Sequence, residues 1–187
     1  MLEEIEQRRK KIARDDRPQI TLFMQTAVLS GDISILTPEG RLLDVLNGRI
    51  SIGPENHEKY LKLDSVFIQH ADGRQQKTKL VHVNKDSIQM AATSGANIGR
   101  GIGGKSGPKS YPFTEKIPVP VKITMPGYEI TGKMYRVSHQ QVDHVLIEKT
   151  TFMPLTDAEV DSIVNHNRWT VPFLAVNKVL ILSLYEL

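Results

Sequence analysis

Short stretches in which hydrophobic and polar residues alternate recur along the chain. Ile20, Leu22 and Met24 form one such stretch, in which only Phe23 breaks the alternation. Because successive side chains of a strand point to opposite faces of a sheet, the pattern predicts a half-buried strand. Similar patterns predict strands at residues 28–35, 60–63, 65–68, 78–83 and 87–90, and a short helix at 41–47 that Gly48 closes. Residues 18–92 are therefore expected to form a small β unit.

Residues 1–17 have a different pattern, which predicts a charged N-terminal helix. Good helix formers dominate, the acidic residues precede the basic ones as the helix dipole favours, and Pro18 limits the helix. Its hydrophobic positions are Leu2, Ile5 and Ile12. Two interpretations stay open: a solvated helix lying on the neighbouring β unit, or an association helix that uses Ile5 and Ile12, one heptad apart.

The second half of the sequence repeats the first. A shift of 101 residues places the stretch at 20–24 on 121–125, and it places Gly31 on Gly132 without a gap. Further along, at an offset of about 92, the same order of matches continues, for example 80–85 (LVHVNK) with 173–178 (FLAVNK). The offset changes at the polar stretch 53–58, where a loop insertion costs little. Several matched blocks in one order indicate a duplication.

The repeat sets the expected fold class. Each copy has about five short strands and one helical turn in roughly 70 residues, which is a marginal size for burying a core alone. We expect a mainly β protein: a tandem duplication of a small antiparallel, SH3-like or split-barrel unit with an N-terminal α-helix and sequential strand pairing. The domains would be the helix (1–17), copy 1 (18–92), a glycine-rich basic linker (93–116) and copy 2 (117–187). Neighbouring copies can share a hydrophobic face or a sheet edge.

Three of the repeated blocks resemble an uncharacterised bacterial domain-of-unknown-function family. They are residues 41–47 (RLLDVLN), 154–160 (PLTDAEV) and 173–178 (FLAVNK). Members of that family carry a short Leu-x-Asp-x-Leu-Asn-like helix, a Pro-Leu-Thr-Asp-Ala strand and a Val-Asn-Lys strand. The second copy departs from this pattern at 142–147, which lacks the asparagine. The resemblance covers most of both halves and supports the β unit, but it implies no activity.

The central loop contains a match to the phosphate-binding P-loop pattern. Residues 99–106 read GRGIGGKS, which fits G-x-x-x-x-G-K-[ST]. A working P-loop needs a strand before it and a helix after it, because N–H groups at the helix N-terminus hold the phosphate. Here Gly107 and Pro108 follow, and the rest of the chain has β patterns. A flexible linker explains the match better, and a nucleotide site is the weakest alternative.

The same loop is basic, which suggests a second alternative. Arg100, Lys105, Lys109 and Lys116 are candidates for contacts with a phosphate backbone or an acidic partner. The net charge of the whole chain is only +3, from 24 basic and 21 acidic residues. Nucleic-acid binding is therefore an alternative that the charge does not favour.

The sequence contains no recognisable set of catalytic or metal-binding residues. It has no cysteine, and none of its six histidines has the spacing of a zinc motif. The repeated pairs Asn84-Lys85 and Asn177-Lys178 are explained by turns, and Trp169 by packing. We therefore expect no catalytic, cofactor-binding or metal site, and no cofactor.

These observations together predict a non-enzymatic interaction or assembly protein of the cytoplasm. The N-terminal residues lack the hydrophobic core of a secretion signal. The longest hydrophobic run, residues 179–182, is far shorter than the ~20 residues that span a bilayer. Unpaired strand edges are the expected docking sites for a protein partner or for further copies of the chain.

Overall fold

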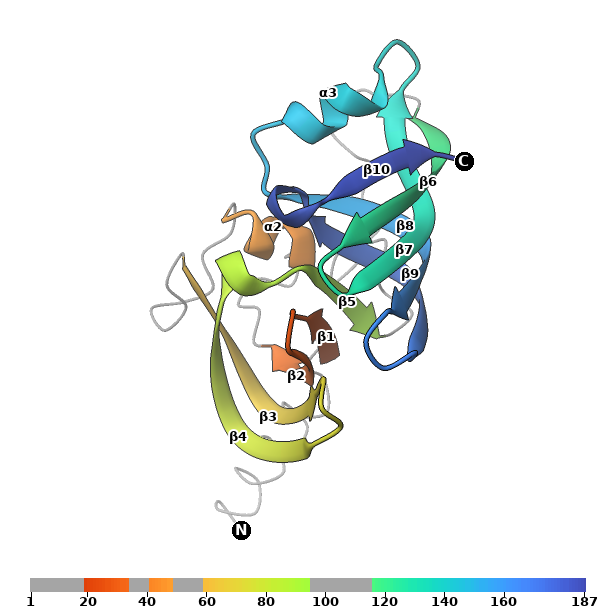
Figure 1. The fold of residues 1–187 in the computed structure, drawn as a ribbon. Coiled ribbons are helices and arrows are strands. Elements are labelled where there is room, and N and C mark those ends of the chain that lie inside the picture. Colours follow the sequence, from red (N-terminus) through yellow and green to blue (C-terminus); the bar gives the residue numbers. More distant parts are fainter. Residues whose placement is uncertain (1–18, 34–40, 49–58, 95–115) are drawn as a thin grey trace.

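The strands of the chain form one antiparallel sheet in the computed structural model (Figure 1). The structure describes residues 19–33, 41–48, 59–94 and 116–187, and within them the sheet has ten strands. The mainly β class predicted from the sequence is confirmed. The predicted N-terminal helix, with Leu2, Ile5 and Ile12, lies outside the described residues.

The two halves of the chain have the same order of elements. The first half contains β1 (Gln19–Phe23), β2 (Ala27–Ile33), α2 (Leu42–Leu46), β3 (Tyr60–His70), β4 (Gln75–Asn84), the 3₁₀ helix η1 (Lys85–Ser87) and β5 (Met90–Ser94). The second contains β6 (Lys116–Met125), β7 (Tyr128–Val137), α3 (Val142–Ile147), β8 (Phe152–Ser162), β9 (Arg168–Asn177), η2 (Lys178–Leu180) and β10 (Ser183–Glu186). Thr93, Ser94 and Lys116, at the ends of the expected linker, belong to strands β5 and β6.

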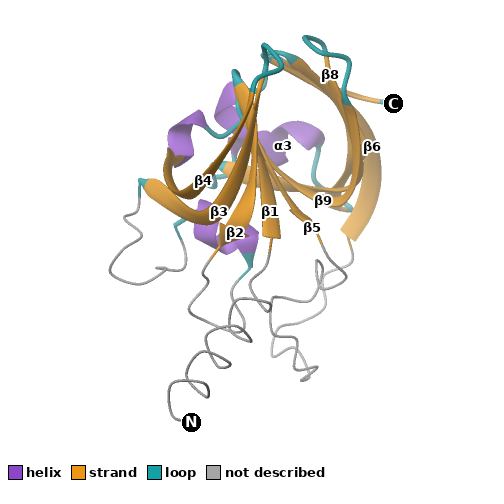
Figure 2. Cartoon of the chain, turned by 90° about the horizontal axis from the view of Figure 1, so that it is seen from below, coloured by secondary structure: helices purple, strands orange, loops and turns teal. Residues whose placement is uncertain are grey.

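The order of strands across the sheet is β10-β6-β7-β8-β9-β5-β1-β2-β3-β4. Figure 2 shows β4, β3, β2, β1, β5 and β9 following one another in a fan. Sequential pairing, which the sequence suggested, holds from β1 to β4 and from β6 to β9. It does not hold for the fifth strand of either half, because β5 pairs with β1, and β10 pairs with β6.

The 3₁₀ helices explain this difference. The strand expected at 87–90 meets β5 only at Met90, since residues 85–87 form η1. The Asn84 side chain accepts a hydrogen bond from the Asp86 N–H at 3.1 Å, and Asn177 does the same for Val179 at 3.1 Å. These caps start a tight turn that carries the chain away from the preceding strand. The turns predicted at the two Asn-Lys pairs are thus 3₁₀ turns.

Both halves contain the same β-bulge. The pairing of β2 with β3 shifts between Ser30 and Asp32, and that of β7 with β8 shifts between Thr131 and Lys133. Opposite each shift stands a non-glycine residue with positive φ, Ser65 (52°) or Asp157 (49°). A bulge bends a strand without ending it, so the strands predicted at 60–63 and 65–68 are one strand, β3.

The hydrophobic core is divided into two clusters, and each cluster takes residues from both halves. Phe152 and Ala175 of the second half lie in the cluster formed mainly by the first half. Phe23 and Met90 lie in the cluster formed mainly by the second half. The sheet is continuous because β5 pairs with β9, and these exchanged side chains fix that pairing from the core side.

Candidate functional site: the two free edges of the sheet

The pairing of β5 with β9 shows how two strand edges of this protein meet, and we call it the seam. Its register places Met90 opposite Val176, Ala91 opposite Ala175 and Ala92 opposite Leu174. All six side chains are buried. The neighbouring Asn177 N–H donates to the Gln89 carbonyl at 2.8 Å, which extends the backbone pairing by one step. The seam is therefore a dry junction between two edges.

Two asparagine side chains reinforce the seam. Asn47, which follows α2, donates to the Phe152 carbonyl at 3.0 Å and accepts from the Phe152 N–H at 2.8 Å. Asn177 donates to the Ile88 carbonyl at 2.9 Å and is almost fully buried. Each amide satisfies backbone groups of the opposite half, which would be costly to bury unpaired.

Aromatic packing also joins the two halves. The Phe23 ring lies edge-on to Trp169, with centroids 5.2 Å apart, and edge-on to Tyr128 at 5.9 Å. The packing role that the sequence suggested for Trp169 agrees with this contact. The Tyr128 hydroxyl donates to the Met24 carbonyl at 3.1 Å, and burial raises the pKa of this hydroxyl.

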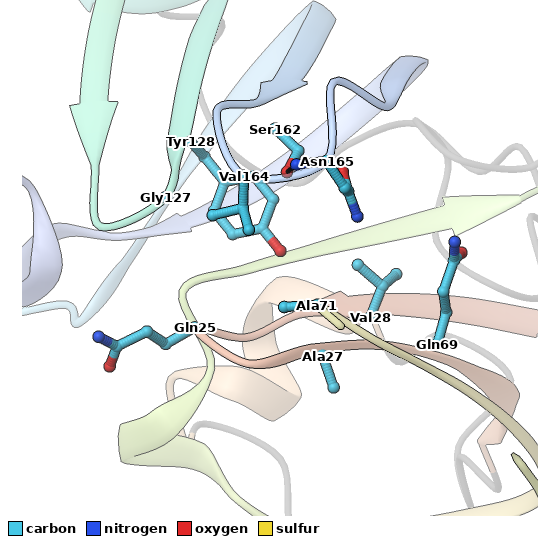
Figure 3. Close-up of a pocket in the computed structure, with 10 residues that line it drawn as sticks. All are labelled: Gln25, Ala27, Val28, Gln69, Ala71, Gly127, Tyr128, Ser162, Val164 and Asn165. Atoms are coloured by element: carbon cyan, nitrogen blue, oxygen red, sulfur yellow. Dashed lines mark hydrogen bonds between the residues drawn. The ribbon is translucent and has the colours of Figure 1, made fainter. Parts of the chain in front are cut away.

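A small pocket opens beside Tyr128, between turns of both halves (Figure 3). Gln25 and Ala71 line it from the first half, and Tyr128, Val164 and Asn165 from the second. Its volume is about 10 Å³. That is room for roughly one water molecule, so the pocket does not suit an organic ligand.

In the part of the chain that the structure describes, strand β4 pairs only with β3 and is the first free edge of the sheet. We call it the β4 edge. Its outer part carries Lys77 and Lys79, both exposed, and such lysines protect an edge from pairing. Its inner part is different, because Leu80 is 42% exposed and Val81 is half-buried. The hydrophobic inner part is the section suited to pairing.

The outward backbone groups of the β4 edge follow from one hydrogen bond. The Lys85 N–H donates to the Lys59 carbonyl, on the β3 side, at 2.9 Å. Because N–H groups of an antiparallel strand alternate between its two sides, those of Asn84, His82 and Leu80 face away from β3. This end of the edge therefore offers donors to an incoming strand.

The second free edge is strand β10, whose only partner among the described strands is β6. We call it the β10 edge. Tyr185 is 49% exposed, and Leu182, just before the strand, is 68% exposed. In the second half, Ile147 at the end of α3 is 77% exposed. Exposed hydrophobic groups next to an unpaired strand are typical of a docking surface.

The structure describes one of the four basic residues that the sequence suggested for phosphate or partner contacts. Lys116 is the exposed first residue of β6. Arg100, Lys105, Lys109 and the P-loop match at 99–106 lie outside the described residues. The association residues Leu2, Ile5 and Ile12 also lie outside them, so the structure brings none of these candidates together.

Several ionisable groups of the described residues form pairs at the surface. Glu129 accepts a hydrogen bond from Lys122 and raises the pKa of that amino group, and Asp157 does the same for Lys133. Exposed pairs of this kind contribute little to stability. Within the described ranges no group of three or more His, Cys, Asp or Glu residues is placed to hold a metal. None of the described helices is long and hydrophobic enough to cross a membrane.

Comparisons of the chain with protein-family models, with curated protein sequences and with solved structures give no significant match. The resemblance to a domain-of-unknown-function family therefore stays a prediction. The functional argument rests on the geometry of the two free edges.

Proposed function

We propose that the chain is a non-enzymatic assembly protein, built from two copies of one small β unit, that binds protein partners through the free edges of its sheet. One observation carries this proposal: the β4 edge and the β10 edge both expose large hydrophobic side chains beside a strand that has one neighbour among the described strands. An exposed edge of this kind binds another strand through main-chain hydrogen bonds and side-chain pockets.

The duplication is supported by matched details of the two halves. Ile20 pairs with Gly31 in β1 and β2, and Val121 pairs with Gly132 in β6 and β7. Lys85 donates to the Val45 carbonyl at the end of α2, at 3.0 Å. Lys178 donates to the Val145 carbonyl in α3, also at 3.0 Å. Repetition of one unit explains these shared contacts more simply than an independent origin of the two halves.

The strand arrangement of each half supports a small SH3-like or split-barrel unit. In each half four strands pair in sequence, and the fifth returns after a 3₁₀ turn to the first. Such a unit has two different edges, formed by its fourth and fifth strands. Joining two units through the seam uses one edge of each kind and leaves one of each kind free.

Nucleic-acid binding is the alternative that the basic loop suggested. Three of its four residues, Arg100, Lys105 and Lys109, lie outside the described residues. In the described part of the chain no observation favours nucleic-acid binding over protein binding at the free edges. The test below therefore includes a nucleic-acid adduct among its outcomes.

The proposal is tested by site-specific photo-crosslinking in the cells that make the protein. A photoreactive amino acid replaces Leu80 on the β4 edge, Tyr185 on the β10 edge, or Glu159 as a control. Glu159 is exposed but belongs to β8, which has a neighbouring strand on each side. We expect discrete protein adducts from the two edge positions and not from the control. Absence of edge adducts, or adducts with RNA from the edges, would contradict the proposal.

A further inference from the structure

We propose that the partner of each free edge is a second copy of this chain, with β10 of one copy pairing antiparallel with β4 of the next. This head-to-tail junction repeats between chains the seam that β5 and β9 form within each chain. The inference rests on the proposed function and deepens it by naming the partner.

The argument begins with the equivalence of the strands. β5 and β10 are the fifth strands of their halves, and they pair with the first strands in the same register. Phe23 is opposite Met90 in the first half, and the equivalent Thr124 is opposite Ser183 in the second. β4 and β9 are likewise the fourth strands, and each pairs with the third strand and leads into a 3₁₀ helix. The two free edges are therefore the equivalents of the two edges that already meet in the seam.

The seam predicts the register of the new junction. The pair Met90 and Val176 of the seam corresponds to Ser183 and Val83 of the next copy. The pair Ala92 and Leu174 corresponds to Tyr185 and Val81 of the next copy. The outward N–H groups of His82 and Asn84 suit this register, because their equivalents are Ala175 and Asn177. The Asn177 N–H already donates across the seam.

The exposed hydrophobic side chains near the free edges occupy positions whose equivalents are covered in the seam. Tyr60 is 41% exposed, whereas its equivalent Phe152 is 2% exposed and packs into the core of the other half. Leu182 and Tyr185 are exposed, whereas their equivalents Gln89 and Ala92 are each 2% exposed. The head-to-tail junction would remove these side chains from water, and hydrophobic burial is its driving force.

Two further positions fit the same geometry. Asn47 contacts the backbone of Phe152 across the seam, and their equivalents are Ile147 and Tyr60. Both equivalents are exposed, so a hydrophobic contact would replace the hydrogen bonds. Asn84 is the equivalent of Asn177, whose side chain donates to the Ile88 carbonyl. In the junction the Asn84 amide would donate to the Ile181 carbonyl of the next copy.

The junction joins two different surfaces, so it is heterologous. Such contacts close into a ring when the rotation between copies allows it, and otherwise continue as a filament. Every copy inside either assembly has both edges paired. A symmetric dimer through two β4 edges or two β10 edges would lack the side-chain complementarity of the seam.

The first test measures the mass of the full chain by light scattering over a range of concentrations. We expect masses well above the 21.0 kDa monomer, either as one fixed size or as a series that grows with concentration. Leu182→Glu should raise the apparent dissociation constant by roughly tenfold or more, because it places a charge in the junction. The matched control is Tyr135→Glu, at a position that is 37% exposed on β7, a strand with a neighbour on each side, which should change it by less than about twofold.

The second test uses the absence of natural cysteines to detect the register. One variant carries Tyr185→Cys and another carries Val81→Cys. The Cα atoms of directly opposite residues in antiparallel strands are about 4.5–5.5 Å apart, which is within the Cα–Cα range of a disulfide. We expect rapid oxidation to a mixed dimer when the two variants are combined, little when either is alone, and much less when Lys79→Cys replaces Val81→Cys.

The outcomes separate the inference from the proposed function. A monomer at all concentrations, or a disulfide formed equally well by Tyr185→Cys alone, overturns the head-to-tail junction. If the edges then crosslink to a different protein in cells, the proposed function stands and only the partner is wrong. If the edges crosslink to nothing, both fail.

Discussion

The side-chain amide of Asn47 holds both backbone groups of Phe152, a residue 105 positions further along the chain. This contact ties the end of α2 to the first residue of β8 across the seam. We expect Asn47→Ala to lower the free energy of unfolding by about 2 kcal/mol, because two partly buried backbone groups lose their partner. Urea unfolding measures the loss.

A suitable control for Asn47 is Asn165→Ala. The Asn165 side chain accepts a hydrogen bond only from Asn167, in a turn. Its replacement should lower the free energy of unfolding by less than about 1 kcal/mol. Equal losses in the two variants would show that Asn47 does not join the halves.

The two equivalent glycines should respond differently to alanine. A Cβ at Gly31 would lie 3.0 Å from the Asp64 carbonyl oxygen and 3.1 Å from a Val66 methyl group. At Gly132 the nearest atoms are 3.4 Å away, which is ordinary contact. We expect Gly31→Ala to lower the free energy of unfolding by about 1–3 kcal/mol, and Gly132→Ala to change it by less than about 1 kcal/mol. Thermal unfolding of both variants measures the two losses. A larger loss for Gly132→Ala than for Gly31→Ala would contradict the distances at the bulge.

Tyr128 should make stability depend on alkaline pH. Burial raises its pKa in the folded chain above the ordinary value of 10.0. Between these two values the unfolded chain has lost the proton and the folded chain keeps it. The contribution of Tyr128 is therefore complete below pH 10.0 and falls as pH rises through the folded pKa.

The variant Tyr128→Phe tests this dependence. Near neutral pH it should be less stable than the parent by about 1 kcal/mol, because the Met24 carbonyl loses its donor. Above pH 10.0 the difference should shrink, because phenylalanine does not ionise. Urea unfolding of both proteins near neutral pH and above pH 10.0 measures this difference in the free energy of unfolding. A difference that grows with pH would refute the raised pKa of Tyr128.

The two capping asparagines should differ in the monomer, in spite of their equivalence. Asn177 both caps η2 and donates to Ile88, whereas Asn84 caps η1. In a background of Leu182→Glu, chosen to disfavour assembly, Asn177→Ala should lower the free energy of unfolding by about 2–3 kcal/mol and Asn84→Ala by about 1 kcal/mol. In the parent chain, Asn84→Ala should in addition weaken self-association, as light scattering would detect.

The local elements of the fold could be predicted from sequence patterns. The alternation at 20–24 falls on β1, and the stretch closed by Gly48 falls on α2. Gly48 has φ of 69°, the left-handed geometry expected of a residue that ends a helix. A glycine inside a strand pattern is typical of a bulge or a close backbone approach, and Gly31 has both. These features depend on neighbours within a few residues, which the sequence displays directly.

The long-range pairing could not be predicted in the same way. Ala91 and Leu184 are equivalent, yet one faces β9 inside the sheet and the other lies on a free edge. Nothing in their immediate neighbours says which edge is covered. Asn47 belongs to the motif at 41–47, but its partner Phe152 belongs to the other half. A signal was present in the absence of that asparagine from the corresponding position of the second half, Ile147, since α2 lies at the seam.

The central position of β5 has a consequence for the growing chain during synthesis. Residues 90–94 leave the ribosome long before residues 168–177 exist, so β5 can pair with β1 but not yet with β9. Until the second half is made, Met90, Ala91 and Ala92 present an unprotected strand edge, and Phe23 lacks Trp169 and Tyr128. A nascent or truncated chain that ends near residue 94 is therefore the most aggregation-prone species of this protein. The second half is therefore the intramolecular cover of this strand edge.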